Sequence, residues 1–271
     1  MFLLTLPRAN KSGDGSPSDR IFGHQCMSDD GVPSGGPGQG GSHFGKPHPP
    51  RSEPLFHAPW PSVALSVLIV VLYGLQSAVL TAPNALADLW FSPKELEVGH
   101  WMGLVTSLFL HGGWPHAIFN AGFALAFASP VSRLFGTNAR GAVNFFTFYI
   151  VCGVLANLGF AVLPHHAGEV LVGASGAISG LAGAASRLMG RRDAGRLAPF
   201  TSPTVVGMTA AWLTSNLLVG LFGVTILTGG AGIAWQAHVA GYLAGLILIG
   251  PLVSVLRLLD YELEEPEPDI L

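Results

Sequence analysis

Three separate stretches of the sequence carry side chains suited to nucleophilic catalysis. Ser175 lies in the small-residue stretch 173–176, and His238 follows much later in the chain. His116 precedes Asn120 by four residues, which on a helix places both side chains on one face. A serine hydroxyl becomes a nucleophile when a base accepts its proton, and a neutral imidazole is such a base. His116 and Asn120 could donate hydrogen bonds to an oxyanion, as acyl transfer requires.

Each of these residues also has a plain structural interpretation. The stretch 173–176 could be a packing seam, because a serine in a transmembrane helix more often packs than reacts. His238 could belong to a proton or ion pathway. The combination of a serine, two histidines and an asparagine, rather than any one of them, favours catalysis.

The surrounding sequence indicates a polytopic membrane protein. Of the 271 residues 11% are charged, against about 25% in an average soluble domain. Five segments lack Asp, Glu, Lys and Arg, and all but 170–186 exceed the roughly 20 apolar residues that cross a hydrocarbon core. They cover residues 54–87, 98–132, 141–168, 170–186 and 197–256. This pattern, with a net charge of −3, disfavours a soluble enzyme, a disulfide scaffold and a nucleic-acid binder.

Six membrane spans fit these segments. The last segment is too long for one span, and the glycine-rich stretch 229–232 is a natural turn within it. We therefore expect an all-α membrane protein with a six-helix domain over residues 60–259. The expected spans lie near 62–81, 115–132, 142–163, 173–189, 204–224 and 234–256.

Two polar tails flank this domain. Gly and Pro make up 19 of residues 1–59, more than the roughly 25–30% that is typical of disordered segments. Residues 260–271 carry six acidic residues and no basic one, so we expect them to be solvated. The pair His165-His166 lacks Cys or acidic partners at ligand spacing, and we predict neither a metal nor a cofactor.

The basic residues predict the orientation in the membrane. Twelve of the thirteen Lys and Arg residues fall on one side of this topology, and Lys94 alone falls on the other. Because Lys and Arg accumulate on the cytoplasmic side, both termini are expected there. Spans two, four and six then run inward, so His116, Ser175 and His238 lie at a similar depth below the outer surface. No organellar targeting pattern is evident, which favours a bacterial inner membrane.

Small residues predict which spans pack together. Gly176 and Gly180 form a Gly-x-x-x-Gly face on span four, and Gly241 and Gly245 form another on span six. Such faces let two transmembrane backbones approach closely. If these two faces pack against each other, the Ser175 and His238 side chains would meet above the seam.

Together these motifs resemble those of the rhomboid family of intramembrane serine proteases, over roughly residues 60–257. The matching patterns are His111-x4-His116-x3-Asn120, Gly173-Ala174-Ser175-Gly176 and Ala237-His238-x2-Gly241-x3-Gly245. The resemblance implies a six-helix fold and a Ser–His dyad, with Ser175 as nucleophile and His238 as base. It also implies an oxyanion site formed by His116, Asn120 and the backbone N–H groups of Ala174 and Ser175.

The resemblance assigns structural roles as well. His111 matches a structural or water-binding histidine, and Gly241 and Gly245 match glycines that pack span six on span four. Span five, near Trp212 and Asn216, matches the element proposed to move aside for substrate entry.

Three positions depart from the family pattern. Met102 stands where an arginine often follows a tryptophan, and Ser132 stands where a glutamate often precedes an arginine. Ser179 replaces the aromatic residue that stacks on the base in some members, so His238 must be oriented differently.

The resemblance implies an endopeptidase that cleaves transmembrane segments of other membrane proteins, which enter laterally from the bilayer. The main alternative is a non-catalytic rhomboid-like adaptor that binds membrane clients, and the intact Ser175 and His238 argue against it. A channel or transporter is disfavoured because the polar residues gather at one depth rather than along a path.

Overall fold

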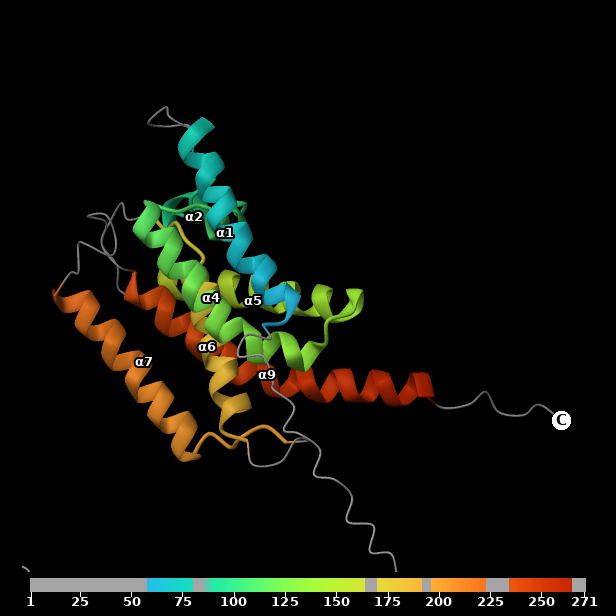
Figure 1. Ribbon diagram of the computed structural model, residues 1–271. Helices are drawn as coiled ribbons and strands as arrows, with labels where there is room; N and C mark the ends of the chain where they lie inside the picture. The colour runs from blue at the N-terminus through green and yellow to red at the C-terminus, as the bar shows by residue number, and fades with distance from the viewer. Residues whose placement is uncertain are drawn as a thin grey trace, which may run out of the picture. The chain divides into compact units, whose positions relative to one another are not determined.

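The computed structural model describes residues 58–79, 86, 88–163, 170–191, 196–222 and 234–264. Nearly all of the predicted tail 1–59, the end of the acidic tail, the turn at 229–232 and the pair His165-His166 lie outside these residues. The helices are α1 (Trp60–Val79), α2 (Pro93–Glu97), α3 (Gly103–Thr106), η1 (Ser107–Phe109), α4 (Trp114–Phe135), α5 (Ala139–Val162), α6 (Ser175–Met189), α7 (Pro203–Phe222) and α9 (Trp235–Glu264) (Figure 1).

The all-α fold class predicted from the sequence is confirmed. No β-strand occurs in the described residues, where one isolated antiparallel bridge joins Phe91 and Leu171. Six helices, α1, α4, α5, α6, α7 and α9, occupy the six predicted spans. Four of these are long and apolar enough to cross a membrane, namely α1, α4, α5 and the Trp235–Leu256 part of α9.

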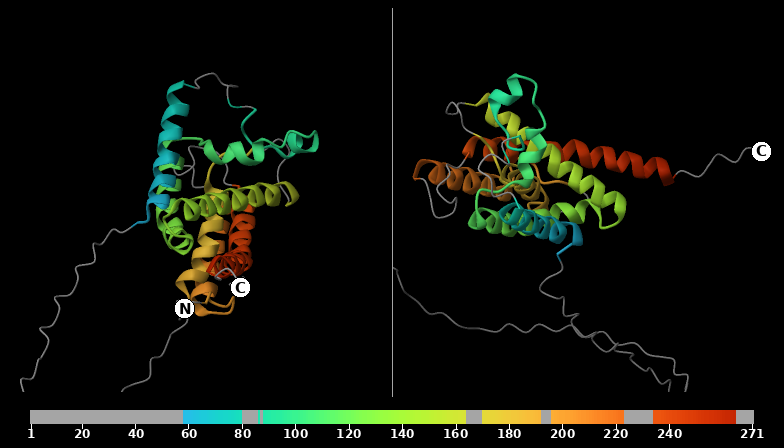
Figure 2. Two further views of the ribbon diagram at one scale, coloured as in Figure 1. Left: turned by 90° about the vertical axis from the view of Figure 1, so that its right-hand side faces the viewer. Right: turned by 90° about the horizontal axis from the view of Figure 1, so that it is seen from above.

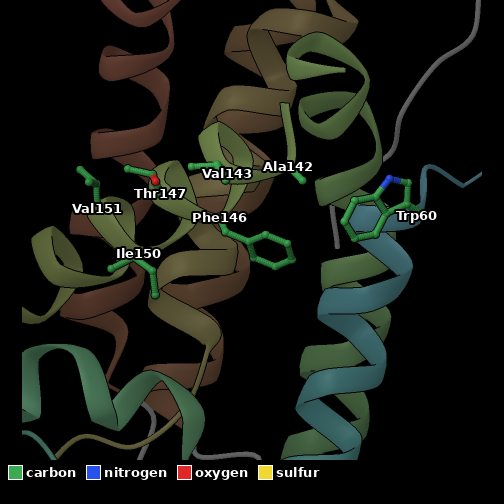
Figure 3. Close-up of a pocket in the computed structure, with 7 residues that line it drawn as sticks. All are labelled: Trp60, Ala142, Val143, Phe146, Thr147, Ile150 and Val151. Atoms are coloured by element: carbon green, nitrogen blue, oxygen red, sulfur yellow. The ribbon is translucent and has the colours of Figure 1, made fainter. Parts of the chain in front are cut away.

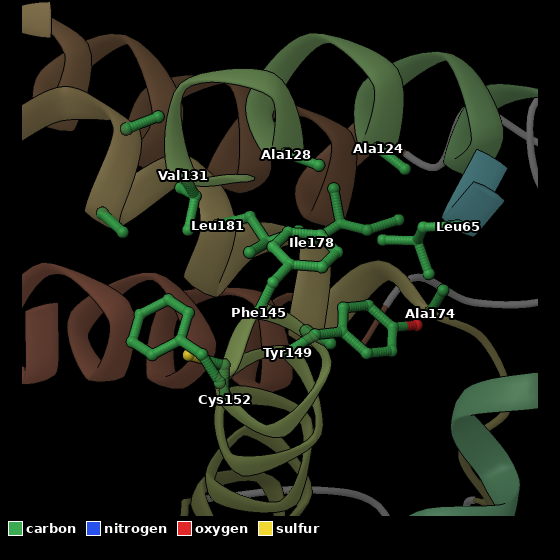
Figure 4. Packing of buried hydrophobic residues seen from close by; sticks show 14 of the residues in the cluster. Leu65, Ala124, Ala128, Val131, Phe145, Tyr149, Cys152, Ala174, Ile178 and Leu181 are labelled. Carbon is green, nitrogen blue, oxygen red and sulfur yellow. The ribbon is translucent and has the colours of Figure 1, made fainter. Parts of the chain in front are cut away.

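Helix α6 lies at the centre of the helical domain. It contacts α4, α5, α7 and α9, and Figures 1 and 2 show it enclosed among its neighbours. Every residue from Gly176 to Ser186 is buried, and most of them are Gly, Ala or Ser. Its larger side chains, Ile178 and Leu181, pack into a cluster with Val131 of α4 and Phe145 of α5 (Figure 4).

The tightest packing joins α6 to α9. A methyl group on Gly241 would overlap the carbonyl oxygen of Gly176, and one on Gly245 would overlap that of Gly180. The two Gly-x-x-x-Gly faces therefore lie against each other, backbone to backbone. Because no side chain separates them, the first turns of α6 and α9 are held at close range.

The segment between α1 and α4 is anchored by polar contacts to the helices below it. Asn157 of α5 donates from Nδ2 to the Leu104 carbonyl oxygen and to Ser107 Oγ, both at 3.0 Å. Gln76 of α1 donates to the His111 carbonyl oxygen at 2.8 Å and accepts from its N–H at 3.0 Å. These bonds fix the entry to α4.

A pocket on the outside of the bundle is apolar and remote from these motifs. It is lined by Trp60, Ala142, Val143, Phe146, Thr147, Ile150 and Val151 (Figure 3). Trp60 Nε1 donates to the carbonyl oxygen of Thr137, which follows the C-terminal end of α4. His116 lies at the opposite end of α4, so the pocket and the candidate chemistry are far apart.

From the backbone contact between α6 and α9 we expect that a side chain added at the contact lowers the stability of the fold. Gly245→Ala should lower the free energy of unfolding by about 1–3 kcal/mol, because the added methyl group forces the two helices apart. The measurement is the thermal unfolding midpoint of the full chain in detergent micelles. Gly207→Ala on α7 is the matched control, since a methyl group there meets no atom within 4 Å. Equal midpoints for the two variants would contradict the packing described.

Candidate active site

Ser175 and His238 are in direct contact. Ser175 Oγ and His238 Nε2 lie 2.7 Å apart, and both side chains are half-buried. Ser175 is the first residue of α6, and His238 lies in the first turn of α9. The contact of Gly176 and Gly180 with Gly241 and Gly245, here called the glycine seam, begins one residue after Ser175 and three residues after His238. The seam therefore sets the distance between the two side chains. The structure thus brings together the pair that the sequence predicted as nucleophile and base.

The second nitrogen of His238 contacts α7. His238 Nδ1 lies 2.6 Å from Asn216 Oδ1, and Asn216 Nδ2 donates to the Trp212 carbonyl oxygen at 2.8 Å. Sequence analysis did not find this contact, although an amide in the apolar span five was a signal for it. Ser179 does not replace the missing aromatic residue, because its hydroxyl donates to the Ser175 carbonyl oxygen at 2.7 Å.

His116 lies against the turn that carries Ser175. Gly173, in that turn, has a φ of +124°, which favours glycine. A Cβ at Gly173 would lie 2.7 and 2.8 Å from two His116 ring atoms and 3.8 Å from Ser175 Oγ. Glycine at this position is therefore required both by the backbone and by the imidazole beside it.

Asn120 lies one turn further along α4 and presents a buried donor. Its side chain is 4% exposed, and its Nδ2 makes no hydrogen bond within the part of the chain that the structure describes. A buried donor without a partner costs free energy. Such a group is therefore available to an acceptor that enters the site.

The backbone at the start of α6 supplies further donors. Ala174 is the buried N-cap residue, and the first N–H groups of a helix have no acceptor within it. The turn is held in place because the Gly173 N–H donates to the Ser107 carbonyl oxygen at 2.9 Å. His116 reaches this turn from α4, and Asn120 lies one turn further along the same helix.

His111 lies just before α4 and beside His116. Its ring is 1% exposed and lies 5.2 Å from the His116 ring, centroid to centroid. Burial, with a smaller effect of His116, lowers the pKa of His111 to about 3, so this imidazole is neutral at pH 7. Within the described residues no three His, Cys, Asp or Glu side chains come together as metal ligands would.

Aromatic side chains connect the helices around the site. Trp212 of α7 lies 6.2 and 5.5 Å from the rings of Phe123 and Phe127 of α4, and 5.9 Å from Tyr242 of α9. The remaining surface of α7 is largely exposed, and Val205 and Asn216 are the buried residues among its described side chains. Helix α7 thus forms the outer wall on the side of His238.

The sequence of this chain is similar to known proteins over much of the helical domain. The family model of the rhomboid domain matches residues 98–255, a range that includes Ser175, His238, His116 and Asn120. A protein of Bacillus subtilis (strain 168) named "Putative rhomboid protease YdcA" is 36% identical over 85 residues, 31% of this chain and 40% of that protein. The chain therefore aligns with less than half of that relative. Since the family model covers more than half of the chain, this chain belongs to the rhomboid family.

Proposed function

We propose that this protein is an intramembrane serine endopeptidase with a Ser175–His238 dyad. The observation that carries the proposal is the 2.7 Å contact between Ser175 Oγ and His238 Nε2. The rhomboid family and the name of the relative support intramembrane proteolysis as the type of activity. The contact joins a hydroxyl to a base in a helical membrane protein, which is what nucleophilic catalysis in a bilayer requires.

The first half of the reaction forms an acyl-enzyme. His238 Nε2 accepts the proton of Ser175 as Oγ bonds to the scissile carbonyl carbon. The carbonyl oxygen becomes an oxyanion in the tetrahedral intermediate. When this intermediate collapses, the C–N bond breaks and the imidazolium gives its proton to the leaving amine.

Donors around Ser175 stabilise the oxyanion. The backbone N–H groups of Ala174 and Ser175 approach it from the start of α6, and His116 and Asn120 approach it from α4. The buried, unpaired Nδ2 of Asn120 supports this role, because it lacks any other acceptor in the described residues. Donors fixed in advance lower the barrier without reorganisation during the reaction.

The second half of the reaction uses water. His238 removes a proton from a water molecule, whose oxygen attacks the acyl carbonyl carbon. The ester bond to Ser175 Oγ then breaks, and the serine regains its proton from the imidazolium. The products are a new carboxylate and a new amine, and the dyad returns to its starting state.

The substrates are transmembrane segments of other membrane proteins. At 1.5 Å per residue, α6 with its 15 residues is roughly 22 Å long, shorter than the hydrocarbon core of about 30 Å. The start of α6, with Ser175, therefore lies below the membrane surface if its other end reaches the opposite face. A substrate helix must open locally there, because its scissile carbonyl is otherwise hydrogen-bonded within the helix.

We further propose a bacterial inner membrane as the location, with both termini in the cytoplasm. The distribution of Lys and Arg supports this orientation. In it, the dyad faces the outer side, from which water reaches Ser175. A non-catalytic adaptor has no use for the Ser175–His238 contact. The gathering of His116, Ser175 and His238 at one predicted depth, rather than along a path, argues against a channel.

Removing either member of the dyad should abolish proteolysis. The parent chain, Ser175→Ala and His238→Ala are each reconstituted in liposomes with a model transmembrane substrate, and the fragments are quantified. We expect cleavage by the parent chain alone, because neither variant can form the activated nucleophile. A fluorophosphonate should label the parent at Ser175 and label His238→Ala much more slowly.

Ser132→Ala is the matched control for this experiment, because Ser132 is a buried serine near the far end of α4. It should cleave the substrate at the rate of the parent chain. Cleavage that survives in Ser175→Ala, at an unchanged thermal midpoint, would refute the mechanism.

Loss of the α4 donor should slow the chemical step. Asn120→Leu, which keeps the size but removes the amide, should lower kcat by roughly 10²- to 10³-fold, as loss of an oxyanion donor does elsewhere. KM should stay unchanged, since the bond forms in the transition state. Initial rates over a range of substrate densities in the bilayer separate the two constants. A raised KM at unchanged kcat would instead assign Asn120 to substrate binding.

The proposed orientation is open to a labelling test. In a chain that carries Cys26→Ser, the thiol introduced by Lys94→Cys lies at an exposed position. It should react with a membrane-impermeant maleimide in intact spheroplasts. The cysteine of Arg196→Cys, at an exposed position on the other side of the predicted topology, should react only after the membrane is permeabilised. The reverse pattern would place the termini outside the cytoplasm.

A further inference from the structure

The amide of Asn216 has one possible orientation in this structure. Its side chain lies between His238 Nδ1, at 2.6 Å, and the Trp212 carbonyl oxygen, at 2.8 Å. A carbonyl oxygen can only accept a hydrogen bond, so the amide nitrogen must face Trp212. The amide oxygen must then face His238.

This orientation determines the tautomer of the His238 ring. An amide oxygen can only accept, so Nδ1 must carry the proton of the neutral imidazole. The lone pair of the ring then lies on Nε2, which is 2.7 Å from Ser175 Oγ. The backbone of α7 thereby sets which nitrogen of His238 can receive the serine proton.

We propose that Asn216 is the positioning residue of His238, so that the site works as a chain of Ser175, His238 and Asn216 across α6, α9 and α7. This inference rests on the proposed proteolytic function. Asn216 does not touch the reacting atoms; it holds the ring plane and the tautomer in which the base accepts a proton. The opposite tautomer would point an N–H group at Ser175 Oγ and could not accept its proton.

The surroundings of Asn216 indicate that its contact with His238 is held in place. Asn216 is the most buried described side chain in the second half of α7, at 9% exposure, while its neighbours Ser215 and Leu217 are exposed. Its Nδ2 is tied to its own helix, which restricts the rotation of the amide. A second polar bond, Thr209 Oγ1 to Tyr242 OH at 3.0 Å, also joins α7 to α9, away from the dyad.

Two substitutions at Asn216 and one control separate positioning from packing. Asn216→Leu keeps the size and removes the acceptor. Asn216→Asp, with its carboxyl protonated in this apolar setting, keeps an acceptor oxygen facing Nδ1 and a donor to the Trp212 carbonyl oxygen. Thr209→Val breaks the other polar bond between α7 and α9 and leaves His238 untouched. Each full chain is assayed in liposomes for kcat and KM on a model transmembrane substrate. The rate of labelling by a small fluorophosphonate, which needs no substrate helix to enter, is measured in parallel.

We expect the rate of the chemical step to fall while substrate binding stays unchanged. Asn216→Leu should lower kcat and the labelling rate together by about 10- to 100-fold, as a misplaced catalytic group does, with KM unchanged. Asn216→Asp should restore most of both rates, and Thr209→Val should match the parent chain. Parental rates in Asn216→Leu, or equal losses in all three variants, would overturn the proposal.

A measurement on the unmodified chain keeps the inference testable if Asn216→Leu does not fold. Nitrogen-15 NMR of histidine-labelled protein, with the His238 signals identified by their loss in His238→Gln, reports the tautomer. We expect the Nδ1–H form, and the Nε2–H form would overturn the proposal. Failure of the proteolytic function is a different result, since it appears as no Ser175-dependent cleavage by the parent chain.

Discussion

The contact between the backbones of α6 and α9 is the constraint on which the site depends. Gly241 and Gly245 meet the carbonyl oxygens of Gly176 and Gly180 with no side chain between them. In a bilayer, lipid tails solvate apolar side chains as well as a neighbouring helix does, so close van der Waals contact drives helix association. The same contact that stabilises the bundle brings Ser175 within hydrogen-bonding distance of His238 on α9. The same glycines are therefore required both for the stability of the fold and for the geometry of the site.

Polar groups near the site are arranged so that most have a partner and a few do not. Asn157 and Gln76 use their amides to hold the segment before α4, and Gly173 uses its N–H to hold the turn before α6. Asn120 Nδ2 is buried and unpaired among the described residues. Both ring nitrogens of His111 and Nε1 of Trp212 are also buried and unpaired there. The paired amides hold the backbone in place, and the unpaired donor of Asn120 supports its proposed oxyanion role.

Sequence alone predicted the helices and most of the site because local signals encode them. Charge-free segments mark the spans, and Gly-x-x-x-Gly spacing marks the faces that pack, so the meeting of Ser175 and His238 followed once the two faces were paired. The role of Asn216 did not follow. It depends on the distance and rotation of α7 relative to α9, and no spacing within either helix reports that relation. The departure at Ser179 indicated that His238 is oriented differently from the base in some relatives, without indicating how.

An amide suits the position beside His238 better than a carboxylate would in this setting. An ionised carboxylate would have to be desolvated in a low-dielectric interior, at a cost of several kcal/mol before any pairing. An asparagine orients the ring through one accepted hydrogen bond and brings no charge. In the proposed mechanism it stabilises the imidazolium less than an aspartate would, so more of the transition-state stabilisation falls on the proposed oxyanion donors. A site built in this way relies on fixed geometry at Ser175 and His238, which the glycine contact between α6 and α9 provides.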